Sequence, residues 1–220
     1  DVTGDKVRCV EHQLLINWVR FHLAHIEKVC PSLSVRFLSP MSPFQLNDEG
    51  RSPVPDQVSR PDDSGETVRF TPDGVFAITH SDTKTSLLFF LEVDMSTESL
   101  ASPKSDPRDI RQKIINYRTY LGTGRYRRYG TLLNATFQGF RLLLLANLSG
   151  RINGLCRVVR EMLPTDFVWV SGQDRMFAEG AGGAIWARGG HCEKPLESIL
   201  GKLGMATPLP SVQKPNLEAK

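Results

Sequence analysis

Three carboxylates occupy positions in this chain that favour metal chemistry. Asp73 follows Pro72 in a turn signal, and Glu92 and Asp94 end a strongly apolar segment about twenty residues further on. Because alternate side chains of a strand point to the same face, Glu92 and Asp94 project together. Two such carboxylates repel each other, and burying them is costly unless a cation, a proton or a basic side chain compensates their charge.

A divalent cation suits oxygen ligands of this kind. If the strand that follows Asp73 lies beside the strand that carries Glu92, a third carboxylate converges on the same spot. Mg²⁺ and Mn²⁺ keep several waters and need only a few protein carboxylates, and such an ion would polarise a phosphodiester and activate water near neutral pH. We therefore predict a metal site at Asp73 and Glu92, with Asp94 as a further ligand candidate. The alternatives are an ordinary turn at Asp73, and helix capping or arginine pairing by the other two acids.

The same residues resemble the active-site signature of PD-(D/E)xK nucleases. A closer similarity is to the bacterial replication-relaxation family, which is associated with plasmids and mobile elements. The resemblance covers residues 8–190 and rests on these strings: Pro72-Asp73-Gly74-Val75-Phe76, Phe89-Phe90-Leu91-Glu92-Val93-Asp94, Thr97-Glu98, Lys113, Tyr117, His12-Gln13-Leu14-Leu15 and Phe167-Val168-Trp169-Val170. It implies a restriction-endonuclease-like core and a DNA partner. Members of that family usually carry a winged-helix segment before this region, and the sequence shows none.

The chain departs from the nuclease signature at one position. That signature places a lysine two residues after the glutamate, where this chain has Asp94. A lysine there would orient the attacking water and stabilise developing negative charge. Lys113 is the first replacement candidate, because it lies one turn before Tyr117 on the inward face of an expected helix. Lys104 is a looser candidate, and a solvated Lys113 is the alternative. The candidate catalytic residues are Asp73, Glu92, Asp94 and Lys113.

Positive charge is concentrated between Pro103 and Tyr129, and all four tyrosines of the chain fall in the same window. Arginine supplies phosphate contacts, and tyrosine offers a stacking surface for unpaired bases. Residues 122–130 are therefore a candidate flexible loop for contacting nucleic acid, and the alternative is that the tyrosines pack on the sheet. The residues that we expect to bind nucleic acid are Arg118, Arg125, Tyr126, Arg127 and Arg128.

The apolar pattern predicts the elements that position these residues. Helices are expected over 10–29, 107–121 and 153–163, and strands over 34–38, 68–70, 75–78, 87–94, 140–148, 167–171 and 184–187. The uninterrupted apolar segment 87–94 should be a central strand, buried on both faces. This order predicts an α/β fold with a central mixed β-sheet flanked by helices. We expect a single domain over 1–205, with an exposed loop at 39–66 and a flexible tail at 206–220.

Composition excludes several classes of protein. With 40% hydrophobic and 23% charged residues, the chain of 220 residues is not disordered throughout, and its net charge of +3 does not decide a partner. No apolar run reaches bilayer-spanning length. The four cysteines form no CxxC pair and no signal peptide opens the chain, so we predict a reduced, cytoplasmic setting. A start at Asp1 without methionine is compatible with a piece of a longer protein.

The leading hypothesis is a DNA-associated domain with a PD-(D/E)xK-like site for Mg²⁺ or Mn²⁺, acting as a metal-dependent endonuclease of a plasmid or mobile element. Since Asp94 replaces the usual lysine, the sequence leaves open whether the domain cleaves DNA. One alternative is a non-catalytic DNA-binding or regulatory domain on the same scaffold. Another is a protein-interaction module in a mobile-element or defence complex.

Overall fold

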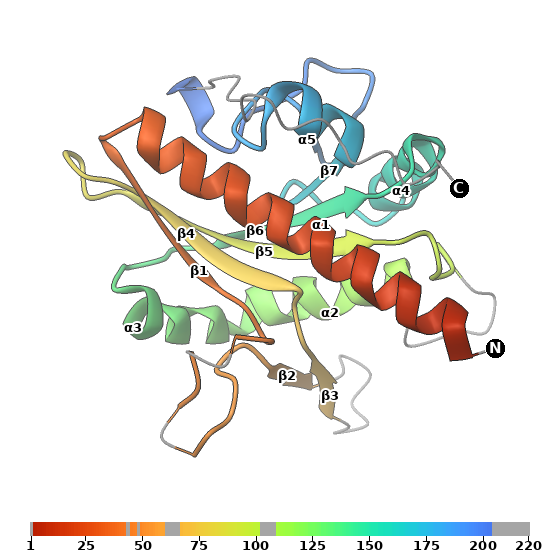
Figure 1. The fold of residues 1–220 in the computed structure, drawn as a ribbon, viewed down its shortest axis with the longest axis horizontal. Coiled ribbons are helices and arrows are strands. Elements are labelled where there is room, and N and C mark those ends of the chain that lie inside the picture. The colour runs from red at the N-terminus through yellow and green to blue at the C-terminus, as the bar shows by residue number, and fades with distance from the viewer. Residues whose placement is uncertain (1, 43–44, 48, 60–66, 102–108, 204–220) are drawn as a thin grey trace.

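A six-stranded mixed sheet forms the centre of the protein, with strand order β1-β4-β5-β6-β7-β8 (Figure 1). The computed structural model describes residues 2–42, 45–47, 49–59, 67–101 and 109–203, of which residues 2–9 are described by their backbone alone. The strands of this sheet are β1 (Leu33–Leu38), β4 (Gly74–His80), β5 (Ser86–Asp94), β6 (Phe140–Ala146), β7 (Val168–Gly172) and β8 (Ala187–Arg188). The predicted mixed α/β architecture is therefore confirmed.

Helices cover both faces of the sheet. They are α1 (Val2–Val29), α2 (Ile110–Thr123), α3 (Tyr129–Leu133), α4 (Ser149–Arg160) and α5 (Gln173–Glu179), with 3₁₀ helices η1 (Arg125–Arg128) and η2 (Gly201–Leu203). Helices α1 and α5 contribute to the core on one face, and α2 and α4 to the core on the other (Figure 1). None of the helices in these described ranges combines the length and the apolar character needed to cross a membrane.

Strand β5 is the central element, as predicted. It pairs antiparallel with β4 and parallel with β6, and β6 in turn pairs parallel with β7. A parallel neighbour requires a crossover connection, and α2 and α4 supply these two crossovers. Because the carboxyl ends of β5 and β6 meet at one edge of the sheet, the acidic end of β5 lies beside the start of α4.

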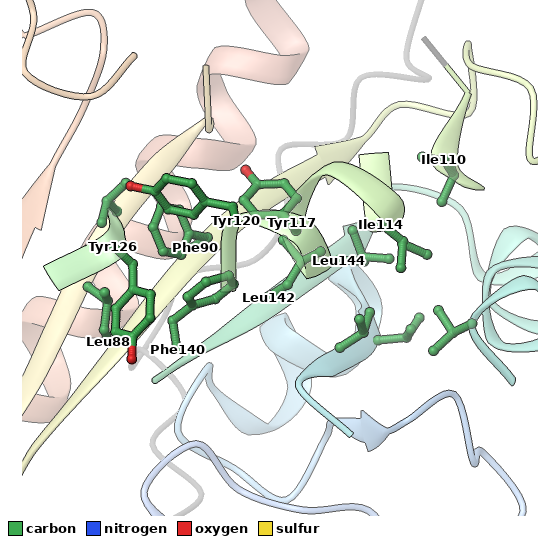
Figure 2. Packing of buried hydrophobic residues seen from close by; sticks show 14 of the residues in the cluster. Leu88, Phe90, Ile110, Ile114, Tyr117, Tyr120, Tyr126, Phe140, Leu142 and Leu144 are labelled. Atoms are coloured by element: carbon green, nitrogen blue, oxygen red, sulfur yellow. The ribbon is translucent and has the colours of Figure 1, made fainter. Parts of the chain in front are cut away.

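An aromatic cluster fills the core beneath α2. Figure 2 shows Tyr117, Tyr120 and Tyr126 gathered around Phe90 of β5 and Phe140 of β6. The ring centroids of Phe90 and Phe140 lie 4.6 Å apart in an edge-to-face arrangement, a geometry that stabilises aromatic pairs beyond their area of contact. All four tyrosines of the chain are at most 2% exposed. The alternative that the tyrosines pack on the sheet therefore holds.

Several predicted boundaries and elements need correction. Helix α1 begins at Val2 rather than at residue 10, and α4 begins at Ser149 rather than at residue 153. The last predicted strand, over 184–187, is only the pair Ala187–Arg188. Helix α5 was not predicted, because its two turns carry little apolar periodicity.

The prediction of an exposed loop over 39–66 is wrong in part. Strand β2 (Asp56–Ser59) pairs with β3 (Thr67–Phe70) in a separate two-stranded sheet, and Val54 and Val58 are buried against the core. The proline- and serine-rich composition concealed these two apolar anchors. Residues 60–66, the tail at 206–220 and Lys104 lie outside the described residues.

A buried carboxylate fastens the small sheet to the helical layer. The side chain of Asp56 is 3% exposed and accepts hydrogen bonds from the Tyr120 hydroxyl and from Nε of Arg128, the latter at 2.5 Å. The Tyr129 hydroxyl donates to the backbone oxygen of Val54 over 2.8 Å. These bonds hold the start of β2, and Val54 just before it, in fixed contact with α2, η1 and α3.

Replacing Asp56 with alanine should therefore destabilise the fold. The change removes the acceptor of the buried Tyr120 hydroxyl and of the Arg128 guanidinium. Because the guanidinium keeps some access to water, the loss in the free energy of unfolding should be about 2 to 3 kcal/mol. Urea denaturation checks this value. Glu49→Ala is the matched control, because Glu49 pairs with Arg51 at 3.2 Å with both side chains mostly exposed, and it should change stability by less than about 0.5 kcal/mol. Equal effects of the two changes would contradict the anchoring role.

Candidate active site

The strand register brings Asp73 and Glu92 together. Gly74 faces Leu91 at the end of the antiparallel β4–β5 register, so Asp73, just before β4, and Glu92, in β5, both adjoin this last pair. The backbone N–H of Asp73 donates to the carbonyl of Leu91 over 3.0 Å. The two carboxylates are close enough for the charge of Asp73 to raise the pKa of Glu92. The predicted convergence of these two strands is confirmed.

Each of the two acids accepts more than one hydrogen bond. Oδ2 of Asp73 accepts from the backbone N–H of Val93 at 2.7 Å and from Nε2 of His12, on α1, at 3.1 Å. Glu92 is 7% exposed, and its Oε1 accepts from the Tyr117 hydroxyl at 2.6 Å. Helix α1 thus reaches Asp73, and α2, on the opposite face of the sheet, reaches Glu92.

Lys113 lies at the site, as the sequence predicted. Its Nζ donates to Oε2 of Glu92 over 3.1 Å and lies 3.0 Å from a carboxylate oxygen of Glu98. It reaches them because α2 begins at an N-cap, Asp109, whose carboxylate accepts from the backbone N–H of Gln112 over 2.7 Å. From that start, the residues facing inward include Ile114 and Tyr117, and Lys113 lies at the margin of this stripe with a side chain 27% exposed.

Asp94 has a different role from the one predicted for it. Its Oδ2 accepts from Nε of Arg151, on α4, at 2.7 Å, and its Oδ1 accepts from the backbone N–H of Ser96 at 3.0 Å. Arg151 also donates to the backbone oxygen of Glu98. Asp94 therefore anchors the segment that carries Glu98, and both of its oxygens are engaged. Pairing with an arginine, the alternative considered for this acid, describes its contacts.

Burial and mutual repulsion alter the ionisation of the site. Burial raises the pKa of Glu92 to about 7, against the opposing charge of Lys113 and with a further increase from Asp73. Burial lowers the pKa of Lys113, but the carboxylates of Glu92 and Glu98 outweigh this and raise it above its usual value. The hydrogen bond to Asp73 raises the pKa of His12 against the effect of burial. A cation bound between Asp73 and Glu92 would stabilise the ionised forms of both carboxylates.

The donor set fits a small divalent cation held by few protein ligands. No group of three histidine, cysteine, aspartate or glutamate side chains within the described ranges is arranged to hold a metal ion. Mg²⁺, however, is commonly bound by one or two carboxylates together with waters and substrate phosphates. Within the same ranges Oδ1 of Asp73 accepts no hydrogen bond, whereas Glu92 would have to exchange its bond to Lys113. Two oxygen donors of this kind suit Mg²⁺ or Mn²⁺.

The predicted nucleic-acid-binding segment is folded rather than loop-like. Residues 125–133 form η1 and α3. Tyr126 is 2% exposed and packs on Phe140 with ring centroids 5.6 Å apart, so its ring offers no stacking surface to a base in this conformation. Arg128 is engaged with Asp56 and with the backbone oxygen of Pro55. Tyr126 is therefore corrected to a core residue, whereas Arg128, which is exposed as well as paired with Asp56, stays a predicted contact for nucleic acid.

Of the remaining arginines of that set, Arg118 is partly buried, whereas Arg125 and Arg127 are exposed. Arg118 donates to the backbone oxygen of Met162 over 3.1 Å, near the end of α4. Arg125 lies 3.7 Å from Asp56 with its side chain 48% exposed, and Arg127 stacks its guanidinium on the Tyr126 ring at 5.5 Å from the centroid. Arg125 and Arg127 thus keep an exposed basic surface at the end of α2.

Sequence reasoning missed the roles of three residues at the site. His12 contacts Asp73, Tyr117 binds Glu92, and Arg151 holds both Asp94 and the Glu98 backbone. The first two belong to the strings that carry the family resemblance, which was the available signal. Nothing in the local pattern marks Arg151, since its place follows from the parallel pairing of β5 and β6.

No family model matches the chain, and neither a curated protein nor a solved structure does.

The raised pKa of Glu92 predicts how stability depends on pH. Between the ordinary value of 4.5 and about 7, the folded state holds a proton that the unfolded state has lost. Glu92 therefore makes the fold less stable as pH rises through this window, by up to about 3 kcal/mol. Glutamine does not titrate, so Glu92→Gln removes this contribution. The free energy of unfolding of the variant minus that of wild type should therefore increase from pH 4.5 to pH 7. Denaturation in urea across this range measures it, and parallel pH profiles would contradict the shift.

Proposed function

We propose that this chain is a DNA-associated nuclease domain of a plasmid or mobile element, with a PD-(D/E)xK-like core and a site for Mg²⁺ or Mn²⁺. The observation that carries the proposal is the proximity of Asp73 and Glu92 at the end of the β4–β5 pair, with Lys113 at hydrogen-bond distance from Glu92. Two carboxylates and an ammonium group in one partly buried cluster are a suitable set for hydrolysis of a phosphodiester.

The position of the cluster in the sheet supports the proposal. In open α/β sheets, ligands bind beyond the carboxyl ends of the strands. Glu92 and Asp94 end β5, and β6 runs parallel beside it to Ala146, opposite Asp94. The adjoining α4 begins at Ser149, so its backbone N–H groups also lie near this end of the sheet. A phosphate approaching here would meet the acids, the lysine and a helix amino terminus together.

Each side chain has a distinct part in this proposal. Asp73 and Glu92 hold the cation, which would polarise the phosphate and lower the pKa of a water molecule. Lys113 donates to a phosphate oxygen as negative charge develops. Tyr117 keeps one oxygen of Glu92 in place through its hydroxyl. Asp94 holds Arg151, and Arg151 holds the segment that brings Glu98 to Lys113.

A second candidate function is favoured by one specific observation. Lys113 already neutralises Glu92 through a direct ion pair, and Asp94 occupies the place of the signature lysine. Such compensation would keep the scaffold stable without any metal ion. The second candidate is therefore a non-catalytic DNA-binding or regulatory domain.

Nicking of supercoiled plasmid tests the nuclease proposal. With Mn²⁺ the wild-type protein should convert supercoiled DNA to open circles, and Asp73→Asn and Glu92→Gln should abolish this because each removes a cation ligand. Lys113→Met should lower the rate by about 100-fold or more. Asp82→Asn is the control, because Asp82 lies in the exposed turn that joins β4 to β5. If the Asp73 and Glu92 variants nick DNA as fast as wild type, the enzyme assignment fails.

DNA binding without metal tests the second candidate. Wild-type protein in EDTA should bind a short duplex with an affinity that falls steeply with salt, and Arg125→Ala with Arg127→Ala should weaken binding and lower the salt slope by about 2. Arg51→Ala provides an exposed-arginine control. Fluorescence anisotropy at several salt concentrations measures both quantities. Unchanged binding by the double variant would exclude this surface as the contact.

A further inference from the structure

The first helix of the protein reaches the acidic site across the sheet. Helix α1 runs diagonally over the face opposite to α2, with its amino-terminal half toward the carboxyl end of β5 (Figure 1). From this half His12 meets Asp73, at the residue that precedes β4. The contact joins residues 61 positions apart in the sequence, so it depends on the docking of α1 rather than on local chain geometry.

The hydrogen bonds of Asp73 are unevenly divided between its two oxygens. Oδ2 accepts from Nε2 of His12 at 3.1 Å and from the backbone N–H of Val93 at 2.7 Å. Over the ranges that the structure describes, Oδ1 accepts none. Two donors on one oxygen, from two different elements, fix the rotation of the carboxylate about its terminal bond. The other oxygen is then free to bind a ligand at a defined position.

We propose that His12 is a positioning residue for the cation: it holds Oδ2 of Asp73 so that Oδ1 is presented as a metal ligand. This inference rests on the proposed function, since it assigns a role within the same site. Partners of this kind, which bind a ligand rather than the metal, orient the ligating atom, and their loss costs about 10-fold to 100-fold in metal affinity. The accessibility of the pair suits the role, because the His12 side chain is 31% exposed and that of Asp73 is 19% exposed.

Conservative variants separate the hydrogen bond from the packing of the imidazole. Glutamine can place an N–H group close to the position of Nε2, whereas alanine removes the donor. Asparagine is one methylene shorter than glutamine and should fail to reach Asp73. His25→Gln is the matched control, because His25 lies on the same helix and, among the residues that the structure describes, no hydrogen bond or ion pair joins it to Asp73, Glu92 or Lys113.

The experiment measures binding of Mn²⁺ alone to the full chain by isothermal titration calorimetry, with nicking rates recorded against Mn²⁺ concentration. His12→Ala and His12→Asn should weaken Mn²⁺ binding by about 10-fold or more, whereas His12→Gln should stay within about threefold of wild type. In nicking, the Mn²⁺ concentration for half-maximal rate should rise in the same two variants, with a smaller change in the plateau rate.

The outcomes distinguish failure of the inference from failure of the proposed function. If wild type binds Mn²⁺ and all three His12 variants bind it equally well, the metal site stands and the positioning role is overturned. Equal weakening in alanine and glutamine variants would also overturn it, because packing rather than the hydrogen bond would then matter. If wild type neither binds Mn²⁺ nor nicks DNA, the proposed function fails and the inference fails with it.

Discussion

The proximity of two carboxylates at the end of the β4–β5 pair is the constraint on which the rest of the site depends. Glu92 is almost fully buried, and Asp73, whose side chain is 19% exposed, lies just beyond the last paired residues of the two strands. Such a pair persists only when donors or cations compensate it. The donors come from helices on both faces of the sheet: Lys113 and Tyr117 from α2, and His12 from α1. The packing of both helices on the sheet is thus coupled to the electrostatics of the acids.

Two ion pairs and a hydrogen bond between them link the two helices on one face of the sheet. Asp94 binds Arg151, Arg151 binds the backbone of Glu98, and the Glu98 carboxylate lies against Lys113. This arrangement gives a physical reason for an aspartate at position 94, because Asp94 supports the segment that carries Glu98. The positive charge beside Glu92 comes from Lys113 of the neighbouring helix.

The sequence predicts those parts of the structure that depend on local pattern. The uninterrupted apolar run before Glu92 identified the central strand, the turn at Pro72 placed Asp73 beside it, and helical spacing turned Lys113 inward. The errors arose where distant segments decide the outcome. Asp56 engages Tyr120 and Arg128 over 64 and 72 positions, and this tertiary network converts an expected flexible basic loop into a packed element. Composition carries no information about such pairings.

The sequence separations within the site have a consequence for how it assembles during folding. Glu92 meets Lys113 over 21 positions and Val93 meets Asp73 over 20, whereas Asp73 meets His12 over 61. Closing a short loop costs less chain entropy than closing a long one, and contacts of small separation tend to form earlier. The hairpin and the helix after it can therefore bring the acids and the ammonium group together as a nearly autonomous unit. The contact between His12 and Asp73 forms only when the first helix docks on the sheet. The acids and the lysine can therefore come together before the site is complete.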